Sequence, residues 1–198
     1  VQVAVLLIIR CQLVGLLSSL HVSPTTLPVF VPYNTAVTDQ NPNDCLGPPY
    51  CAHYNGYHYA VLNTNNPHAI NTFIMAAYHD FGTSSAYDLG TYILSHELLE
   101  WAADPFDHYS SVQNPAAATS LFMNTAPAWS SPYYGNFCLT SLEVADPLEG
   151  WFGTVSPTSK YLVADGAFLS WFARQSPSTG FGGLYDLGGV FSTYSTAC

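Results

Sequence analysis

The first twenty residues form an almost unbroken apolar run. Four polar residues interrupt it and fall on one half of a helical wheel: Gln2, Arg10, Gln12 and Ser19. This pattern predicts an amphipathic helix that covers a sheet. The alternative is a membrane anchor or a signal peptide, but the polar interruptions and the lack of a basic leading segment argue against it.

Three short runs downstream are rich in valine, isoleucine, phenylalanine and tyrosine, as β-strands are. They span residues 27–32, 57–63 and 72–78. The first run contains two prolines, which predict an edge strand or a strand end. The polar segments 34–50 and 80–90 are expected to be loops, because they are rich in asparagine, aspartate, proline, glycine and serine.

The pattern changes to a helical period between residues 89 and 103. Five apolar residues recur on or beside one face: Leu94, Leu98, Leu99, Trp101 and Ala102. His96 and Glu100 lie on the opposite face, about 40° apart around the helix axis. Asp104 precedes Pro105, and proline disfavours a helical conformation in the residue before it. The helix is therefore predicted to end there.

The second half of the chain is expected to consist of loops and short elements, because proline, serine, tyrosine, asparagine and glycine dominate it. A second helix is predicted at residues 166–174, and the tail 179–198 is expected to be a hairpin or loop. The order of elements predicts an α+β fold. Residues 1–198 are expected to form one domain, with a sheet-and-helix subdomain at 1–104 and a loop-rich subdomain at 105–198.

Charge is scarce in this chain of 198 residues, of which 8% are charged and 48% hydrophobic. Lys and Arg number 3 against 13 Asp and Glu, which gives a formal net charge of −10. So few basic residues cannot neutralise nucleic-acid phosphates or attract anionic lipids, so we expect neither partner. The neutral polar surface is typical of a secreted protein. The start at Val1 instead of Met predicts a processed or trimmed product.

Cysteine usage is consistent with an oxidising compartment. Cys45 and Cys51 bracket a short loop and are predicted to form one disulfide. Cys138 and Cys198 are predicted to form a second disulfide that ties down the C-terminus. Cys11 lies in the apolar run and is expected to be a buried free thiol. The alternative is that all five cysteines are reduced core residues.

The segment His96-Glu97-Leu98-Leu99-Glu100 has the layout of a metalloprotease helix. Residues four apart point the same way from adjacent turns, so His96 and Glu100 can reach one metal ion. Glu97 sits about 100° around the helix, where its carboxylate can contact the attacking water. Zinc lowers the pKa of such a water toward about 7, and Glu97 would take its proton as general base.

The simpler interpretation of this segment is an exposed acidic helix face with His96 at the surface. The distribution of charge argues against it. Glu97, Glu100, Asp104 and Asp107 crowd one helix end, and no basic residue lies near them in the sequence. Carboxylates at a helix C-terminus also oppose the helix dipole. A bound cation would remove both difficulties.

A catalytic zinc ion usually takes three protein ligands. Glu143 is the best candidate for the third, because it is an isolated glutamate just before the turn at Pro147. Asp146 is expected to orient His96 through its other ring nitrogen. Asp104 is the runner-up ligand. Four other histidines are weaker candidates. His79 and His108 are expected to be polar loop residues, and His53 and His58 could line a substrate groove but are expected to pack in a strand.

Two stretches, Ser95 to Phe106 and Leu142 to Leu148, resemble a group of uncharacterised secreted bacterial proteins of zincin type. They are more distantly similar to the plant EXORDIUM (phosphate-induced) family. The resemblance implies a zincin-like fold with His96, Glu100 and Glu143 as ligands and Glu97 as base. Glu100 departs from ordinary zincins, which have histidine there, and a carboxylate makes the metal less Lewis-acidic.

The sequence therefore predicts a secreted hydrolase that uses one zinc ion, with a peptide as the expected substrate. A non-catalytic extracellular binding protein with a structural or vestigial metal site is the first alternative. The second is a hydrolase of ester or glycosidic bonds in a polymer, for which the 14 Tyr, 11 Phe and 4 Trp would suit a substrate surface. A glycosidase needs two carboxylates across a groove, which Glu97 and Glu143 could supply.

Overall fold

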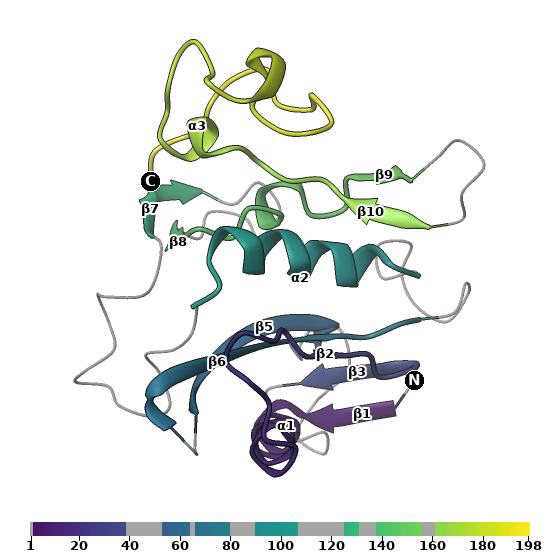
Figure 1. Ribbon diagram of the computed structural model, residues 1–198. Helices are drawn as coiled ribbons and strands as arrows, with labels where there is room; N and C mark the ends of the chain where they lie inside the picture. The colour runs from purple at the N-terminus through teal and green to yellow at the C-terminus, as the bar shows by residue number, and fades with distance from the viewer. Residues whose placement is uncertain are drawn as a thin grey trace.

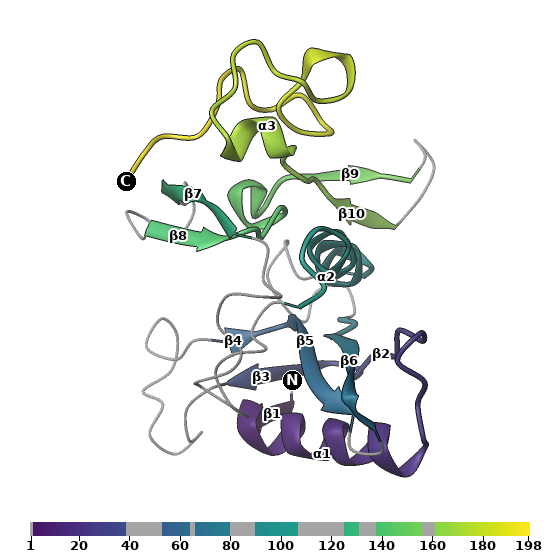
Figure 2. The ribbon, with the colours of Figure 1, turned by 60° about the vertical axis from the view of Figure 1, so that its left-hand side comes forward.

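The structure is a computed structural model with a mixed α+β architecture, as predicted. It describes residues 2–38, 53–63, 66–79, 90–106, 125–130, 138–155 and 161–198. One helix, α2 (Tyr92–Ala103), lies between two layers of small sheets (Figure 1). The first half of the chain forms the lower layer and the second half forms the upper layer, and a view turned by 60° gives the same arrangement (Figure 2).

The lower layer contains a three-stranded sheet in the order β2 (Val29–Phe30), β6 (Asn66–Ala76) and β5 (Gly56–Asn63). β2 pairs parallel to β6, whereas β5 pairs antiparallel to it, with His58 opposite Ile74. The strands predicted at 57–63 and 72–78 are confirmed. The run at 27–32 forms only a two-residue edge strand, because proline cannot donate a backbone hydrogen bond to a ladder.

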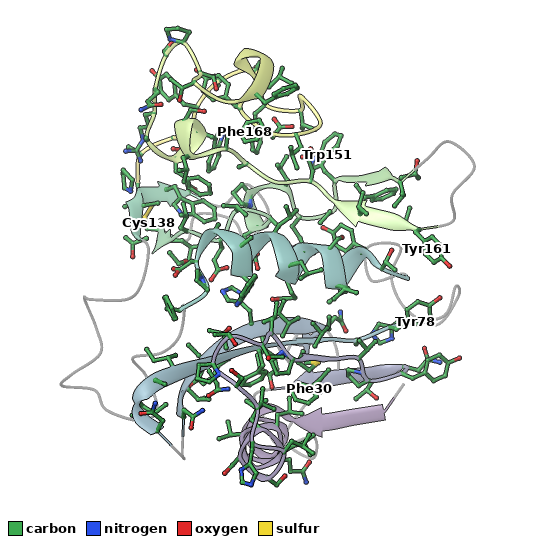
Figure 3. The ribbon with its side chains drawn as sticks, in the orientation of Figure 1. Phe30, Tyr78, Cys138, Trp151, Tyr161 and Phe168 are labelled. Carbon is green, nitrogen blue, oxygen red and sulfur yellow. A yellow bond between two sulfur atoms is a disulfide. The ribbon has the colours of Figure 1, made fainter. Side chains whose placement is uncertain are left out.

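The two faces of this sheet carry different side chains, because successive residues of a strand point to opposite sides. Tyr59, Val61 and Phe73 pack with Leu17 of helix α1 (Leu6–Ser19). Phe30 lies on the same side and packs edge-on against Phe73 (Figure 3). The other face, which includes Ile74 and Ala76, packs against α2. His58 and Ala60 occupy the α2 side of β5.

The predicted N-terminal helix is confirmed for residues 6–19, where α1 covers the sheet. Within the described residues, no helix is long and apolar enough to span a membrane. The prediction is wrong for β1 (Gln2–Val5), which pairs parallel to β3 (Thr35–Thr38). β3 also pairs with β4 (His53–Tyr54), and it lies where a loop was predicted. Two valines in β1 and the β-branched residues in β3 favour strands, and the pairing resolves the ambiguity of such short segments.

Hydrogen bonds attach α2 to both layers. Trp101 donates through Nε1 to Thr72 Oγ1 of β6 at 3.0 Å. On the other side, the Ser95 hydroxyl accepts from the backbone N–H of Ala164 at 2.8 Å. α2 ends at Asp104, before Pro105, as predicted.

The upper layer consists of short elements, as predicted for this half of the chain. Two antiparallel pairs form it, together with a 3-10 turn η2 (Asp146–Leu148): β7 (Thr125–Ser130) with β8 (Cys138–Ser141), and β9 (Phe152–Thr154) with β10 (Leu162–Ala164). The helix predicted at 166–174 is shorter, α3 (Leu169–Phe172). The tail contains only the 3-10 turn η3 (Phe181–Gly183). Trp129, Trp171 and Phe172 pack together as its aromatic core.

The predicted disulfide between Cys138 and Cys198 is confirmed, and it ties the C-terminus to β8 (Figure 3). It closes a separation of 60 residues, which removes much conformational freedom from the unfolded chain. A disulfide is compatible with an extracellular location. Cys45, Cys51 and the side chain of Cys11 lie outside the described residues.

Two buried carboxyl groups, those of Asp165 and Asp186, organise the tail. Asp165 accepts from the backbone N–H groups of Gly166 and Gly188. Both oxygens of Asp186 accept backbone hydrogen bonds, from Val190 at 2.8 Å and Phe191 at 2.7 Å. Burial raises the pKa of Asp165, and the charge of Asp186 raises it further.

A raised pKa means that the folded state holds a proton that the unfolded state has released. The contribution of Asp165 to stability is therefore greatest at low pH, and it is lost as pH rises from 3.8 through the folded-state pKa. Asp165→Asn, whose amide can donate to Asp186, is expected to be at least as stable as wild type at pH 7–8. Its advantage should disappear toward pH 4.

Urea denaturation between pH 4 and pH 8 measures this difference. Asp186→Asn is the matched control, and it should lose about 1–3 kcal/mol at every pH because an amide nitrogen cannot accept from a backbone N–H. A loss of stability in Asp165→Asn that does not change with pH would show that the two carboxyl groups do not share a proton.

Candidate metal centre

Helix α2 buries its charged side chains. His96 is 7% exposed, Glu97 5% and Glu100 4%, whereas Leu98 on the predicted apolar face is 38% exposed. The interpretation of an exposed acidic helix face is therefore wrong. Burial of charged groups costs several kcal/mol per ion unless they are paired, so these side chains need compensating partners.

A close approach between α2 and the start of β5 encloses this side of the helix. A Cβ at position 56 would lie 2.6 Å from Oε1 of Glu97 and 2.6 Å from Cγ2 of Ile93. Real contacts of a Cβ are longer than this, so only glycine fits at Gly56 without displacing Glu97. The glycine therefore lets the sheet close over Glu97.

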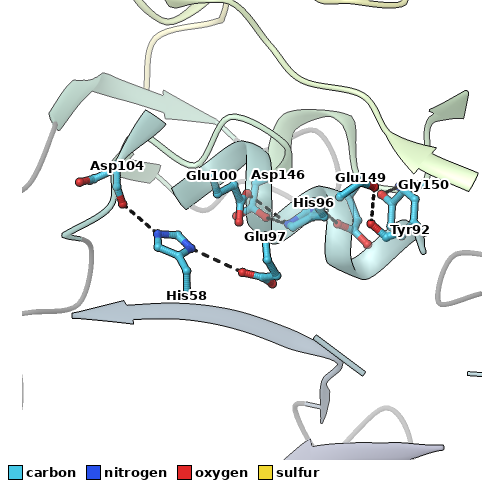
Figure 4. Close-up of polar contacts among 10 residues, drawn as sticks. His58, Tyr92, His96, Glu97, Glu100, Asp104, Asp146, Glu149 and Gly150 are labelled. Carbon is cyan, nitrogen blue, oxygen red and sulfur yellow. Dashed lines mark hydrogen bonds and ion pairs between the residues drawn. The ribbon is translucent and has the colours of Figure 1, made fainter. Parts of the chain in front are cut away.

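Three carboxylates surround His96 (Figure 4). Its Nε2 lies 3.1 Å from Oε1 of Glu100 and 3.4 Å from Oδ1 of Asp146. Its Nδ1 faces Oε2 of Glu149 at 3.6 Å. α2 supplies His96 and Glu100, and the upper layer supplies the other two carboxylates from the turn η2 and the residue after it.

The electrostatics of His96 show how strongly this site attracts a positive charge. Burial lowers the pKa of His96, but the carboxylates of Glu100, Asp146 and Glu97 outweigh burial and raise it well above 6.5. The pKa of Asp146 is raised by its own burial and by the charge of Glu100, against the lowering effect of His96. The carboxylates thus repel one another, and a cation between them would relieve this repulsion.

Tyr92 fixes the segment that carries Glu149. Its buried hydroxyl accepts from the backbone N–H of Gly150 at 3.1 Å. Burial, with the charge of Glu149 as the second cause, raises the pKa of Tyr92 to about 12. Tyr92 therefore stays neutral at physiological pH, and it anchors the upper layer to the first turn of α2 (Figure 4).

A second histidine approaches α2 from the lower sheet. His58 projects from β5, and its Nδ1 lies 3.5 Å from Oε2 of Glu97. Its Nε2 lies 3.0 Å from the backbone carbonyl oxygen of Asp104, at the end of α2. His58 is 3% exposed, and it therefore links the lower sheet to both Glu97 and the helix C-terminus.

Among the described residues, two groups of three bring metal-binding atoms within 4.8 Å of one another. One group is His96, Glu100 and Asp146; the other is His58, Glu97 and Glu100. Glu100 belongs to both. Its buried Oε1 has Nε2 of His96 as its partner, at 3.1 Å. An imidazole with carboxylate oxygens is a donor set that divalent metals, zinc included, accept.

The structure brings most of the predicted site residues together. His96, Glu97, Glu100 and Asp146 lie in these groups, and Glu143 does not, although it is 8% exposed and lies three residues from Asp146. The runner-up, Asp104, is completely buried. Its carbonyl contacts His58, and its Oδ1 accepts from the N–H of Phe106.

The other histidines divide between the described and undescribed parts of the chain. His79 is buried beside Asn55, with Nε2 3.3 Å from its Oδ1, and belongs to neither group. The side chain of His53 and all of His108 lie outside the described residues.

Sequence reasoning missed two residues of this region, His58 and Glu149. His58 packs in a strand, as predicted, but on the face that meets α2. The signal was the alternation in β5, where a histidine occupies a row with glycine, alanine and leucine. Glu149, one of only four glutamates, follows Asp146 by three residues, a spacing that returns to the same side of a 3-10 turn.

Comparison of the chain with family models, curated proteins and solved structures gives no significant match.

Proposed function

We propose that the protein is a secreted, zinc-dependent hydrolase that cleaves peptides in a zincin-like fold. The observation that carries the proposal is the group of buried His96, buried Glu100 and half-buried Asp146, whose carboxylates face an imidazole. Arg174 donates to backbone carbonyl oxygens in the upper layer, at Ala128 and Thr196. In the described part of the chain, the carboxylates of this group thus have histidine, and no arginine or lysine, as their ion-pair partner.

His96, Glu100 and Asp146 would hold the ion. A zinc ion held there would supply a Lewis acid that lowers the pKa of water toward about 7. Glu97 would accept a proton from that water as general base, since it follows the first ligand and its charge reaches His96. The low dielectric of the buried site strengthens both effects.

The proposal revises two roles expected from the sequence. Asp146 replaces Glu143 as third ligand, because Asp146 faces Nε2, the same ring nitrogen that faces Glu100. Glu149 takes the orienting role assigned to Asp146, because it faces Nδ1. A carboxylate behind a metal-bound histidine fixes its tautomer and ring orientation.

One observation favours the non-catalytic alternative, a binding protein with a structural metal site. The group is deeply enclosed, and α2 packs against sheets on both sides. A structural site would have four protein ligands and no water. In that protein, chelation would lower the melting temperature without changing an activity.

Metal analysis combined with a protease assay separates these functions. The purified chain should contain zinc, or bind it after dialysis against a chelator. The zinc-loaded protein should release peptides from casein, and chelation should abolish this activity until zinc is restored. A zinc-loaded, folded protein that cleaves no peptide substrate would favour the structural site, and a protein that binds no metal would contradict both functions.

A further inference from the structure

We infer that the protein binds a second divalent cation beside the first, through His58, Glu97 and Glu100. This inference rests on the proposed function only for the first metal site. The second position lies beside the first, on the side of the lower sheet that carries His58, and Glu100 belongs to both groups (Figure 4).

The hydrogen bonding of His58 is the first argument. A carbonyl oxygen only accepts, so Nε2 of His58 must donate its proton to the Asp104 carbonyl at 3.0 Å. Nδ1 is then the ring nitrogen that faces Oε2 of Glu97, 3.5 Å away. A cation held between these two atoms would bind both.

This arrangement is the one that metal-bound histidines use. Such a histidine donates its free N–H to a carbonyl or carboxylate, which fixes the tautomer and points the other nitrogen at the ion. The Asp104 carbonyl plays this part behind His58. Glu149 lies in the corresponding place behind His96, with its Oε2 3.6 Å from Nδ1.

Glu100 is the residue that both groups share. It is 4% exposed, and its Oε1 pairs with Nε2 of His96 at 3.1 Å, so this oxygen faces the first group. The carboxylate lies within reach of the ligand atoms of both groups. A carboxylate has two oxygens, so it can bind one ion with each.

The charges agree with two ions. Four carboxylates lie within ion-pair distance of the two imidazoles: Glu97, Glu100, Asp146 and Glu149. Two divalent cations would balance the charge of four ionised carboxylates.

Occupation of the second position would change the role of Glu97. In the proposed reaction Glu97 accepts a proton, but a cation bound to its carboxylate removes that basicity. Hydrolysis is therefore expected to reach its maximum at one equivalent of zinc and to fall as the second binds.

Zinc titration of the metal-free full chain at pH 7.5, followed by calorimetry and native mass spectrometry, tests the second site. Wild type should bind two equivalents. His58→Gln should bind one, and the matched control His79→Gln, another buried histidine, should bind two. Glu97→Gln provides a second variant if His58→Gln fails to fold, and it should weaken only the second equivalent, by about tenfold or more.

A wild-type protein that binds a single equivalent would overturn the second site, as would a His58→Gln protein that still binds two. Asp146→Asn tests the proposed function separately, because this variant alone should lose the first equivalent of zinc. Two equivalents with undiminished hydrolysis would support the second site and contradict Glu97 as the general base.

Discussion

Glu97→Gln is expected to lower kcat for peptide hydrolysis by about 100- to 10,000-fold, the usual contribution of a general base. The amide has the shape of the carboxylate but cannot accept the proton of the attacking water. It can still contact His58 and the backbone around Gly56, so the fold should persist. The first equivalent of zinc should also persist, since Glu97 is absent from the group of His96, Glu100 and Asp146.

Steady-state kinetics on a fluorogenic peptide, with zinc content and melting temperature measured on the same preparation, would establish this result. Glu143→Gln is the matched control, because it makes the same change in a glutamate that is similarly buried. Its kcat should stay within a few-fold of wild type. Full activity in Glu97→Gln, with one zinc ion bound, would rule out the proposed mechanism.

Asp146→Asn is expected to weaken the binding of the first zinc ion by at least about 100-fold. Even an outer partner of a metal ligand typically contributes 10- to 100-fold, and a direct ligand should contribute more. The carboxylate of Asp146 lies 3.4 Å from Nε2 of His96, on the side that Glu100 also faces. A neutral amide there would remove one of the charges that attract the ion.

The same titration on Glu143→Gln identifies the third ligand. The structure places Asp146 in the group and leaves Glu143 outside it, so Glu143→Gln should bind zinc nearly as tightly as wild type. The opposite order, with Glu143→Gln losing zinc and Asp146→Asn retaining it, would restore the ligand set expected from the sequence. Circular dichroism of both variants would confirm that neither result comes from unfolding.

The sequence was informative where a local pattern determines the structure. The helical period and Pro105 defined α2 and its end, and the spacing of His96 and Glu100 placed both side chains on one side of the helix. The disulfide between Cys138 and Cys198 was predicted as a bond that ties down the C-terminus, and the structure confirms it. The fold class followed from the order of the elements, and the division into two subdomains stays a prediction.

The sequence could not show which side of α2 is buried. A helical wheel of this segment separates an apolar face from an acidic face, and the apolar face is usually the one that is buried. The structure buries His96, Glu97 and Glu100 and leaves Leu98 partly exposed, because layers on both sides of the helix cover it. That choice depends on long-range packing, such as the contact at Gly56, which no local pattern contains.

The same limit explains the third ligand. Glu143 and Asp146 are three residues apart, and their different positions depend on the turn η2 and on how Tyr92 anchors the segment after it. His58 was equally hidden, because its partner Glu97 is 39 positions away in the chain. Only the packing of β5 against α2 brings these two side chains together.

Anomalous diffraction at the zinc edge, from crystals of the zinc-loaded chain, would show whether His96, Glu100 and Asp146 bind zinc. We expect a peak about 2.0–2.2 Å from Nε2 of His96 and from one carboxylate oxygen each of Glu100 and Asp146, with a water in the fourth position. The absence of a peak at this position, or a zinc ion bound there without Asp146, would contradict this expectation.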